Sequence, residues 1–541
     1  MVSDVGDGDG AGTTARVATG RRGRPAGIGH VTAVPGPGLR SVGGRSRYGR
    51  SAVTSRLASF TVFVASGAVL VLEILAGRLL APYIGVTLQT FTGIIGVVLT
   101  GIAGGTFLGG RLADRRDPRP LLPFVVAAGG VLAVLTVPLI RLFGPSADGA
   151  IGSIVLLASV SFLLPSAVLS AVTPMVVKIC LATVDETGRV VGRLSAMGTA
   201  GSLVAVFVTG FVFVATFPTT PVVIALGVGL VALGFALWLS LGRPGDRRAV
   251  AATLVAVVAS SGFALAAPGP CDVESTYFCA EVRVDPDRPT GRVLLLDSLR
   301  NSYVDLADPT HLEFGYTQIL GDVVEALAPG TRTLDAVHVG GGGFTMPRYL
   351  EATRPGSTNV VFELDPSVVE LAEDRLGLVP TPTTTVRTGD ARVHLRALDP
   401  ASADLVIGDA FGGEAVPWHL TTREFVEQIR ATLRPGGVYA LNLIDGGPLG
   451  FVRAEVATLR DVFAHVAVVA PAARIAGDEG GNFVVVASDA PLPTDAIRTA
   501  NAARGDDDQV LDDPAGIDAF VGDARVLTDE FAPVDQLITP V

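Results

Sequence analysis

Two kinds of hydrophobic pattern divide this chain. Between about residues 58 and 267, long apolar runs follow one another with only short polar breaks. From about residue 280 onwards, short apolar runs alternate with stretches of helical length. Runs of ~20 apolar residues have the length of a membrane-spanning helix, whereas alternating strands and helices are typical of an α/β domain. The pattern therefore predicts two architectures in one chain.

The first pattern predicts a membrane domain of about seven helices. Its segments are rich in Gly and Ala, which let helix backbones pack closely in lipid. So many consecutive apolar segments argue against a soluble bundle. The first segment is not expected to be a cleaved signal peptide, because further spans follow it. The expected spans are 58–80, 91–110, 121–141, 151–177, 195–216, 221–241 and 249–267.

The second pattern predicts a mostly parallel, doubly wound sheet, preceded by a hairpin formed by VRVDP and GRVLLLD. The expected strands are 335–339, 359–363, 384–388, 404–409, 436–442, 465–470 and 482–487. The expected helices are 345–353, 366–375, 391–397 and 421–433. We therefore expect a disordered basic tail (1–56), a membrane domain (57–268), a small β subdomain with a connecting helix (269–330) and a Rossmann-like domain (331–541).

The basic residues predict the orientation of the membrane domain. Short cytoplasmic loops carry an excess of Arg and Lys, and here they follow the second, fourth and sixth spans, while the opposite loops hold little but Arg141. This places the N-terminus in the cytoplasm and, after seven spans, the C-terminal domain outside. If the weak seventh segment does not cross, the domain instead faces the cytoplasm. The basic loop residues are Arg111, Arg115, Arg116, Arg119, Lys178, Arg189, Arg193, Arg243, Arg247 and Arg248.

Composition and cysteine content exclude two classes of function. The net charge of -11 argues against general nucleic-acid binding. Of the three cysteines, Cys180, Cys271 and Cys279, none forms a CxxC motif or a Cys/His cluster, so we expect no metal site. Cys271 and Cys279 follow the seventh span closely. Outside the cell they could form a disulfide, and two unpaired thiols are the alternative.

A glycine-rich turn carries the clearest chemical signal. In DAVHVGGGGFTMPRYLEATRPGSTNVVFELD (335–365), an apolar strand ends in Gly340, Gly341, Gly342 and Gly343, and the next strand ends in Glu363. Glycines let the chain turn tightly and let a ligand approach the backbone. An acid about 20 residues further on suits the hydroxyls of a ribose. The segment therefore predicts a nucleoside-binding βαβ unit.

Further acidic residues follow the other expected strands. In a doubly wound sheet, ligands bind at the carboxyl ends of the strands, where Asp365, Asp390 with Ala391, and Asp409 are expected. Asp390 would accept a hydrogen bond from an adenine amino group, and Ala391 would leave room for the ring. The alternative for Asp365 and Asp390 is that they cap the helices that follow.

These segments resemble the spermidine synthase family, the aminopropyltransferases, and specifically the membrane-fused bacterial spermidine synthase-like proteins. The matching segments are LLLDSLRNSY, HLEFGYTQIL, VHVGGGG, VFELD, GDA, DLVIGDAF and TTREFVEQIRATLRPGGVYALN, together with VLEILAGRLLAPYIGV, FTGIIGVVLTGIAGG and LGGRLADRRDPRP in the apolar half and LTDEFAPVDQL near the end. The resemblance implies a fold class: a multi-pass α-helical membrane bundle fused to an α/β Rossmann-like domain of the methyltransferase type with a small β subdomain.

The resemblance also implies a reaction. Decarboxylated S-adenosylmethionine, or S-adenosylmethionine itself, would bind across the glycine loop, and Asp409 would deprotonate an amine that attacks the aminopropyl carbon, without a metal. Tyr316 and Glu414 would contact the amine. The chain departs from the family in three places: the family has aspartates where this chain has Gly343 and Gly412, and a glutamine in the turn where this chain has Arg300, Asn301 and Ser302.

Two other functions remain open. One is an S-adenosylmethionine-dependent methyltransferase, and the other is a non-catalytic sensor or transporter that binds a nucleoside or a polyamine. The partners we expect are the lipid bilayer of a bacterial cell membrane, a small amine and, as an open alternative, a second copy of the chain in a homodimer. His338 and His419 are expected to be structural. In the first span, we expect Glu73 to pair with another helix and Arg78 to reach the interface.

Overall fold

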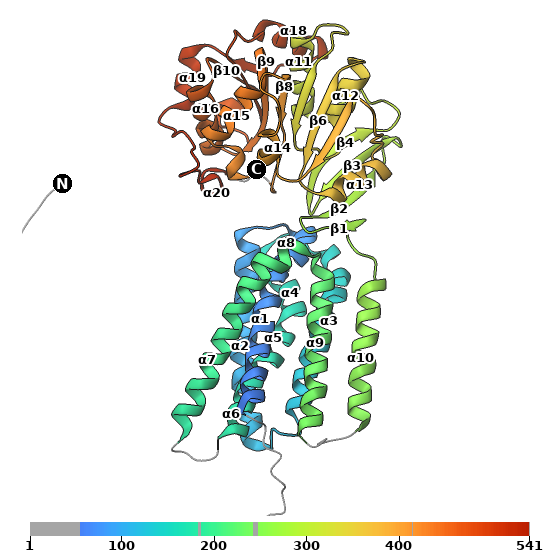
Figure 1. Cartoon of the computed structure of the whole chain (residues 1–541), viewed down its shortest axis with the longest axis vertical. Coiled ribbons are helices and arrows are strands. Elements are labelled where there is room, and N and C mark those ends of the chain that lie inside the picture. Colours follow the sequence, from blue (N-terminus) through green and yellow to red (C-terminus); the bar gives the residue numbers. More distant parts are fainter. Residues whose placement is uncertain (1–54, 182–185, 242–246, 414, 540–541) are drawn as a thin grey trace, which may run out of the picture. The chain divides into compact units, whose positions relative to one another are not determined.

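The computed structural model describes residues 55–181, 186–241, 247–413 and 415–539, so nearly all of the expected tail (1–56) lies outside the described residues. Figure 1 shows a bundle of helices in the first half and an α/β region in the second. The helices of the bundle are α1 (Ser55–Ile84), α2 (Leu88–Arg115), α3 (Leu122–Phe143), η1 (Gly144–Ser146), α4 (Ile151–Ala158), η2 (Ser159–Leu163), α5 (Leu164–Ser170), α6 (Val172–Cys180), α7 (Thr187–Val208), η4 (Thr209–Phe213), α8 (Val214–Thr216), α9 (Thr219–Ser240) and α10 (Arg247–Ala266).

Six helical stretches in the described part of the chain are long and apolar enough to cross a membrane. The seventh expected span corresponds to α10, whose apolar part, Ala251–Ala266, is shorter than the other six. The six stretches are Ser55–Ile84, Leu88–Arg115, Leu122–Ser146, Ile151–Cys180, Thr187–Thr216 and Thr219–Ser240.

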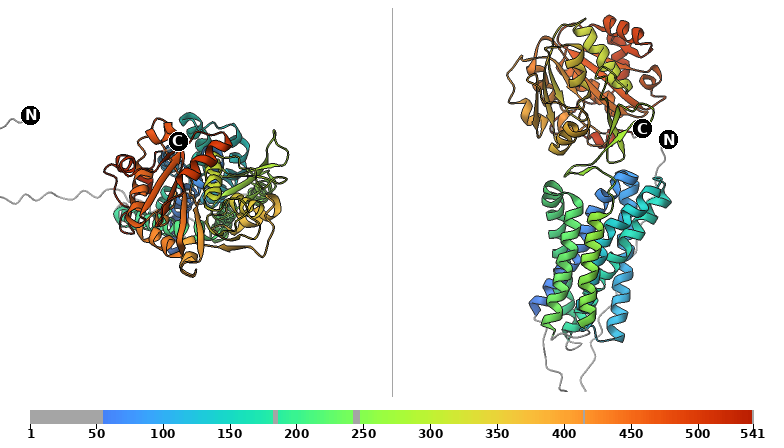
Figure 2. Two further views of the ribbon diagram at one scale, coloured as in Figure 1. Left: turned by 90° about the horizontal axis from the view of Figure 1, so that it is seen from above. Right: turned by 90° about the vertical axis from the view of Figure 1, so that its right-hand side faces the viewer.

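Small residues bring the helices of the bundle into close contact. The right-hand view in Figure 2 shows the long helices of the bundle lying side by side. Where α1 meets α7, a Cβ atom added at Gly201 would lie 2.1 Å from the carbonyl oxygen of Phe63. A Cβ atom at Gly105 of α2 would lie 2.0 Å from the carbonyl oxygen of Ala167. These glycines therefore set the distance between neighbouring helices, as expected from the Gly-rich composition.

The second half contains two sheets. The antiparallel four-stranded sheet has the order β1-β2-β3-β4, and the eight-stranded sheet has the order β12-β10-β11-β9-β8-β5-β6-β7. The strands are β1 (Val273–Glu274), β2 (Cys279–Val284), β3 (Gly291–Leu296), β4 (Leu299–Asp305), β5 (Asp335–Val339), β6 (Thr358–Glu363), β7 (Thr384–Thr388), β8 (Ala403–Gly408), β9 (Leu433–Asp445), β10 (His465–Ala470), β11 (Gly481–Ser488) and β12 (Gln509–Leu511).

Helices connect and cover the strands of the large sheet. They are α11 (Gly315–Leu327), α12 (Thr345–Thr353), α13 (Pro366–Arg375), α14 (Ala391–Leu395), η5 (Trp418–Leu420), α15 (Arg423–Thr432), α16 (Gly450–Val462), α17 (Ala472–Ala476), α18 (Thr494–Arg504), α19 (Pro514–Val521) and α20 (Val534–Leu537). Side chains of β8 alternate between the two faces. Leu405 and Ile407 pack in one core with Leu320 of α11, whereas Val406 packs in the other with Phe425 of α15.

The sheet is mixed: the predicted parallel arrangement is correct for five strands, whereas the two later predicted strands, β10 and β11, and the unpredicted β12 pair antiparallel. Strands β9, β8, β5, β6 and β7 run parallel. Strands β10, β11 and β12 are added by antiparallel pairing. The connection 471–480 between β10 and β11 is shorter than the dozen or more residues that a parallel crossover needs, so these strands form a hairpin.

The strand order creates one point at which the chain reverses direction across the sheet. From β5 the chain proceeds through β6 and β7 on one side, and then returns to β8 and β9 on the other. The carboxyl ends of β5 and β8 therefore lie side by side, and such a switch point is where ligands of doubly wound sheets bind.

Cys271 and Cys279 form a disulfide, the first of the two alternatives considered for this pair. The bond closes the segment 271–279 between α10 and β2. Cys180 is a free cysteine.

We expect Gly201→Ala to destabilise the bundle. The new methyl group would collide with the backbone of Phe63, and overpacking of this kind costs ~1–3 kcal/mol. The matched control is Gly192→Ala in the same helix, where nothing lies within 4 Å of an added Cβ atom. Thermal unfolding in detergent should show a lower midpoint for Gly201→Ala and an unchanged or higher midpoint for Gly192→Ala. Equal midpoints would contradict the packing described here.

Candidate active site

The glycine turn after β5 packs against the end of β8. The φ angle of Gly340 is +104°, and a Cβ atom at this position would lie 2.3 Å from the carbonyl oxygen of Asp409. The amide of Asp409 donates to the carbonyl of Val339 over 2.8 Å. Only glycine combines this backbone conformation with such a close approach. The turn therefore places the backbone of the glycine loop directly beside Asp409.

The Glu363 side chain holds the glycine loop through its carboxylate. One oxygen accepts hydrogen bonds from the amides of Gly341 (2.9 Å) and Gly342 (3.0 Å), and the other accepts from the amide of Asp365 (3.0 Å). Burial raises the pKa of Glu363, and these amides oppose that shift. A carboxylate offers about four lone-pair positions. With three of them used, Glu363 retains one for a ligand hydroxyl.

The carboxylate of Asp409 lies in a small hydrogen-bond network. The hydroxyl of Tyr316 donates to Oδ2 over 3.1 Å, and Nδ2 of Asn442 donates to Oδ1 over 2.8 Å. Asn482 in turn donates to the side-chain oxygen of Asn442 over 3.0 Å. Burial raises the pKa of Asp409 to about 6, and the two donors limit the rise. Burial and the Asp409 charge also raise the pKa of Tyr316 well above its usual value. The network thus poises Asp409 to exchange a proton near neutral pH.

Asp365 caps α13. One of its oxygens accepts from the amide of Ser367 over 2.9 Å, and the other accepts from the hydroxyl of Ser275 in the disulfide-closed segment. The side chain is 1% exposed. Both oxygens are therefore used within the fold, which is the capping role considered as the alternative to ligand binding.

Asp390 caps α14 and also reaches His419. One oxygen accepts from the amides of Arg392 (2.8 Å) and Val393 (3.3 Å). The other lies 3.3 Å from Nε2 of His419. Ala391 follows, with its side chain buried. Asp390 therefore combines a structural role with a position at the carboxyl end of the sheet.

The sequence did not single out Asp529 as an anchor for the C-terminal segment. Its carboxylate receives two hydrogen bonds from Arg392, of 2.8 and 2.7 Å, and a third from Thr422. This paired arrangement fixes the segment beside the Asp390 turn. An arginine directly after a helix-capping GDA motif is a weak signal, because its partner lies 137 residues away.

Asn442 is a further site residue that the sequence analysis missed, whereas Ser302 was noted only as part of the turn that lacks the family's glutamine. An asparagine within the apolar strand ALNLI is itself a signal, because a buried amide needs partners. Ser302 of β4 accepts a hydrogen bond from the amide of Gly343 over 2.9 Å. A Cβ atom at Gly343 would lie 2.8 Å from the Cβ atom of Ser302. The small sheet therefore fills the space beside the fourth glycine.

Three other residues were considered in the sequence analysis. Glu414 lies outside the described residues. Gly412 donates its amide to the carbonyl of Ala415 over 2.8 Å and so belongs to a tight turn. His338 is buried, its ring contacts Asn359, and burial lowers its pKa to about 4. Within the described ranges, no group of three or more His, Cys, Asp or Glu side chains could hold a metal ion.

Curated relatives of this chain carry one name. The chain is 31% identical over 210 residues to the polyamine aminopropyltransferase of Vibrio vulnificus, covering 37% of this chain and 68% of that protein. It is 32% identical over 241 residues to the polyamine aminopropyltransferase of Mycobacterium tuberculosis, covering 44% of that protein. No protein-family model matches the chain.

Among solved structures, a probable spermidine synthase from Corynebacterium glutamicum is similar to this chain. The sequence identity is 30% and the TM-score is 0.45, covering 50% of this chain and 98% of the other. A structure of spermidine synthase in complex with the transition-state analogue AdoDATO has 19% identity and a TM-score of 0.33, covering 49% of this chain and 87% of the other.

We expect Glu363→Gln to loosen the glycine loop. The variant loses the charged acceptor shared by two loop amides, and hydrogen bonds to charged groups contribute about 1.5–3 kcal/mol each. Hydrogen exchange should therefore speed up at the amides of Gly341 and Gly342. The control is Glu373→Gln, an exposed residue of α13, which should leave the exchange unchanged. Continued protection of both amides in Glu363→Gln would contradict this role.

Proposed function

Because this chain belongs to the polyamine aminopropyltransferase family, we propose that it transfers an aminopropyl group from decarboxylated S-adenosylmethionine to a small amine. One observation carries the proposal more than any other. The buried carboxylate of Asp409 lies beside the glycine loop and at the switch point of the sheet, and it receives a hydrogen bond from Tyr316. A carboxylate with a pKa of about 6 is a suitable base for an ammonium substrate.

The reaction needs one proton transfer and one displacement. The substrate ammonium loses a proton to Asp409, and the free amine attacks the aminopropyl carbon bonded to the sulfonium. A nitrogen–carbon bond forms while the carbon–sulfur bond breaks. The electron pair of that bond moves to sulfur and leaves a neutral thioether nucleoside. The remaining lone pair of Glu363 would accept one ribose hydroxyl, and Asp390 would face the adenine.

The helical half supports a membrane-bound protein with its C-terminal domain outside the cell. Arg141, near the end of α3, donates to the carbonyls of Ala264 (2.6 Å) and Ala267 (2.8 Å) at the end of α10. Helices α3 and α10 therefore end on the same side of the bundle. Helices α1 and α3 run in the same direction, and α10 ends on the side where α3 ends. Helix α10 therefore acts as a seventh crossing, after which the chain lies on the side of the membrane opposite Ser55.

This orientation agrees with two independent features. Arg and Lys are concentrated in the loops at the Ser55 end, which is typical of the cytoplasmic side. The Cys271–Cys279 disulfide follows directly after α10, and disulfides persist mainly in oxidising compartments.

The same features favour a second candidate function. Neither decarboxylated S-adenosylmethionine nor S-adenosylmethionine is expected outside the cell. An external domain would then bind a nucleoside or a polyamine without turnover, as a membrane sensor does. Turnover assays of the purified full-length protein distinguish the two candidates irrespective of orientation.

The direct test measures aminopropyl transfer by the purified protein with decarboxylated S-adenosylmethionine and a panel of diamines. We expect transfer that Asp409→Asn lowers at least ~100-fold, because positioned general bases contribute 10²–10⁴-fold. The control Asp399→Asn, at an exposed residue, should keep full activity. Saturable binding of the nucleoside without transfer would replace this proposal with the sensor.

The pH dependence of transfer should report the protonation of Asp409. Since the base must be ionised, kcat/KM should fall as the pH drops through about 6, the pKa that burial gives this group. The Tyr316 hydroxyl stabilises the ionised form, so Tyr316→Phe should move the acid limb to higher pH. If the acid limb of the pH profile of kcat/KM does not move in Tyr316→Phe, Asp409 is not the titrating group.

Sidedness is tested with reporters fused after residue 541 in intact cells, one active only in the cytoplasm and one active only outside. We expect the external reporter to be active. Activity of the cytoplasmic reporter would show that α10 does not cross, and would leave the transferase proposal in place.

A further inference from the structure

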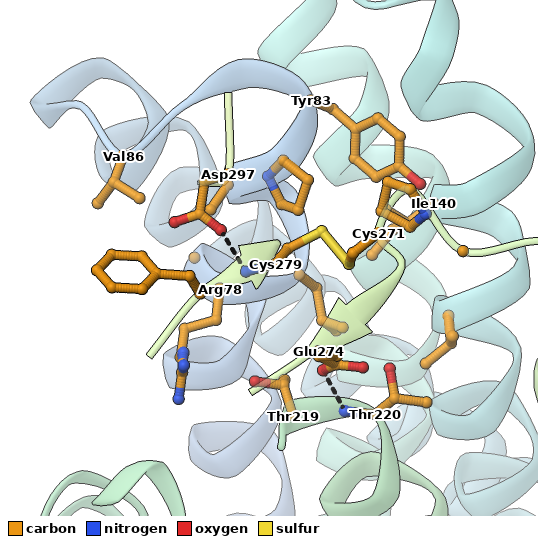
Figure 3. A pocket seen from close by; sticks show the side chains of 18 of the residues that line it. Arg78, Tyr83, Val86, Ile140, Thr219, Thr220, Cys271, Glu274, Cys279 and Asp297 are labelled. Carbon is orange, nitrogen blue, oxygen red and sulfur yellow. Dashed lines mark hydrogen bonds between the residues drawn. A yellow bond between two sulfur atoms is a disulfide. The ribbon is translucent and has the colours of Figure 1, made fainter. Parts of the chain in front are cut away.

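A cavity of about 210 Å³ lies at the end of the bundle where α1 and α3 finish. Its walls come from α1, α2, α3, the start of α9 and the disulfide-closed segment 271–279. Figure 3 shows Arg78, Thr220, Glu274 and Asp297 among the residues that surround it. This cavity is separate from the carboxyl ends of β5 and β8, and the proposed transfer reaction does not use it.

The lining carries two positive and two negative side chains, Arg78, Arg141, Glu274 and Asp297. Within the described part of the chain, no ion pair joins any two of them. Arg78 donates instead to the carbonyls of Val214 (3.2 Å) and Thr276. Arg141 donates to the carbonyls at the end of α10. The guanidinium groups are thus held by neutral acceptors, and their charge is not cancelled by a bonded carboxylate.

The two carboxylates are held in a similar way, each by one backbone amide. Glu274 accepts from the amide of Thr220 over 2.9 Å, and Asp297 accepts from the amide of Cys279 over 3.0 Å. The dashed lines in Figure 3 mark these two bonds. Each bond engages one carboxylate oxygen, which leaves the second oxygen able to accept a ligand donor.

The charges of this cavity are poorly compensated within the fold. Burial raises the pKa of Asp297, although Arg78 and the Cys279 amide oppose the shift. Asp297 lies in the two-residue turn between β3 and β4, whose geometry accounts for its φ angle of +55° and which holds the residue at the cavity. Desolvated charges without bonded counter-charges are costly. A molecule that brings both signs of charge would offset that cost.

We propose that this cavity binds a small zwitterion, a molecule with an ammonium group for Glu274 and Asp297 and a carboxylate for Arg78 and Arg141. This volume is that of ~7 water molecules in liquid water. It suits an amino acid and is smaller than the pockets that bind drug-sized ligands. A diamine would meet two guanidinium groups, and a dicarboxylate would meet two carboxylates. Balanced lining charge therefore selects a zwitterion over either of these.

The experiment measures binding of 4-aminobutyrate to the full-length protein in detergent by calorimetry. Its matched competitors are 1,4-diaminobutane and succinate, which have the same four-carbon skeleton with one sign of charge. Glycine and 6-aminohexanoate are zwitterions with a shorter and a longer carbon chain than 4-aminobutyrate. We expect saturable binding by at least one member of the zwitterion series.

The variants Glu274→Gln and Asp297→Asn should each weaken that binding at least tenfold. The control Asp287→Asn, an exposed residue of the β2–β3 turn, should bind as the unaltered protein does. Thermal unfolding checks that each variant is folded. Glu274 and Asp297 lie on different elements, so if one variant fails to fold, the other still tests the proposal. Absence of zwitterion binding, binding that survives both folded variants, or equal binding of all three four-carbon compounds would each overturn the proposal. Because the proposed transfer site would also bind a diamine, the three compounds are compared in the Asp409→Asn background, which keeps the outcome independent of aminopropyl transfer.

Discussion

The carboxylate of Glu363 is the interaction on which the candidate site depends. It lies at the end of β6 and accepts hydrogen bonds from two amides of the glycine loop after β5. Because the loop also touches the backbone of Asp409, one buried charge aligns the ends of three neighbouring strands. Without an acceptor there, the part-buried loop amides would lose their partner, at a cost of roughly 1–3 kcal/mol each. The proposed nucleoside site and the proposed base therefore share one anchor.

The sequence predicted β5 (335–339) with its observed bounds, because a buried parallel strand is largely apolar. It also predicted the bounds of β7 (384–388), although this strand is polar and has no buried residue. It could not predict the antiparallel addition of the last strands, since pairing direction depends on connections and not on hydrophobicity. The ends of the strands identified Asp409, but not Asn442, which lies within the next strand, β9. The local hydrophobic pattern predicts which helix or strand a residue belongs to. It does not predict that Asn442 and Asp409 are hydrogen-bonded, because only the folded sheet brings them together.

The disulfide-closed segment 271–279 connects the two halves chemically as well as covalently. Glu274 binds the start of α9, and Thr276 accepts from Arg78 of α1. Ser275, between them, donates to Asp365, whose amide donates to Glu363. Consecutive residues of one short segment thus contact the bundle, the cavity at its end and, through Asp365, the anchor of the glycine loop.

The contact between Gly343 and Ser302 constrains the evolution of this chain. The family resemblance implies an aspartate at position 343, yet any side chain there would meet Ser302 at 2.8 Å. A mutation that restores the acid alone would damage the packing before it could improve ligand binding. A side chain at position 343 therefore needs a shift or a smaller residue at position 302, so the two positions cannot be varied independently.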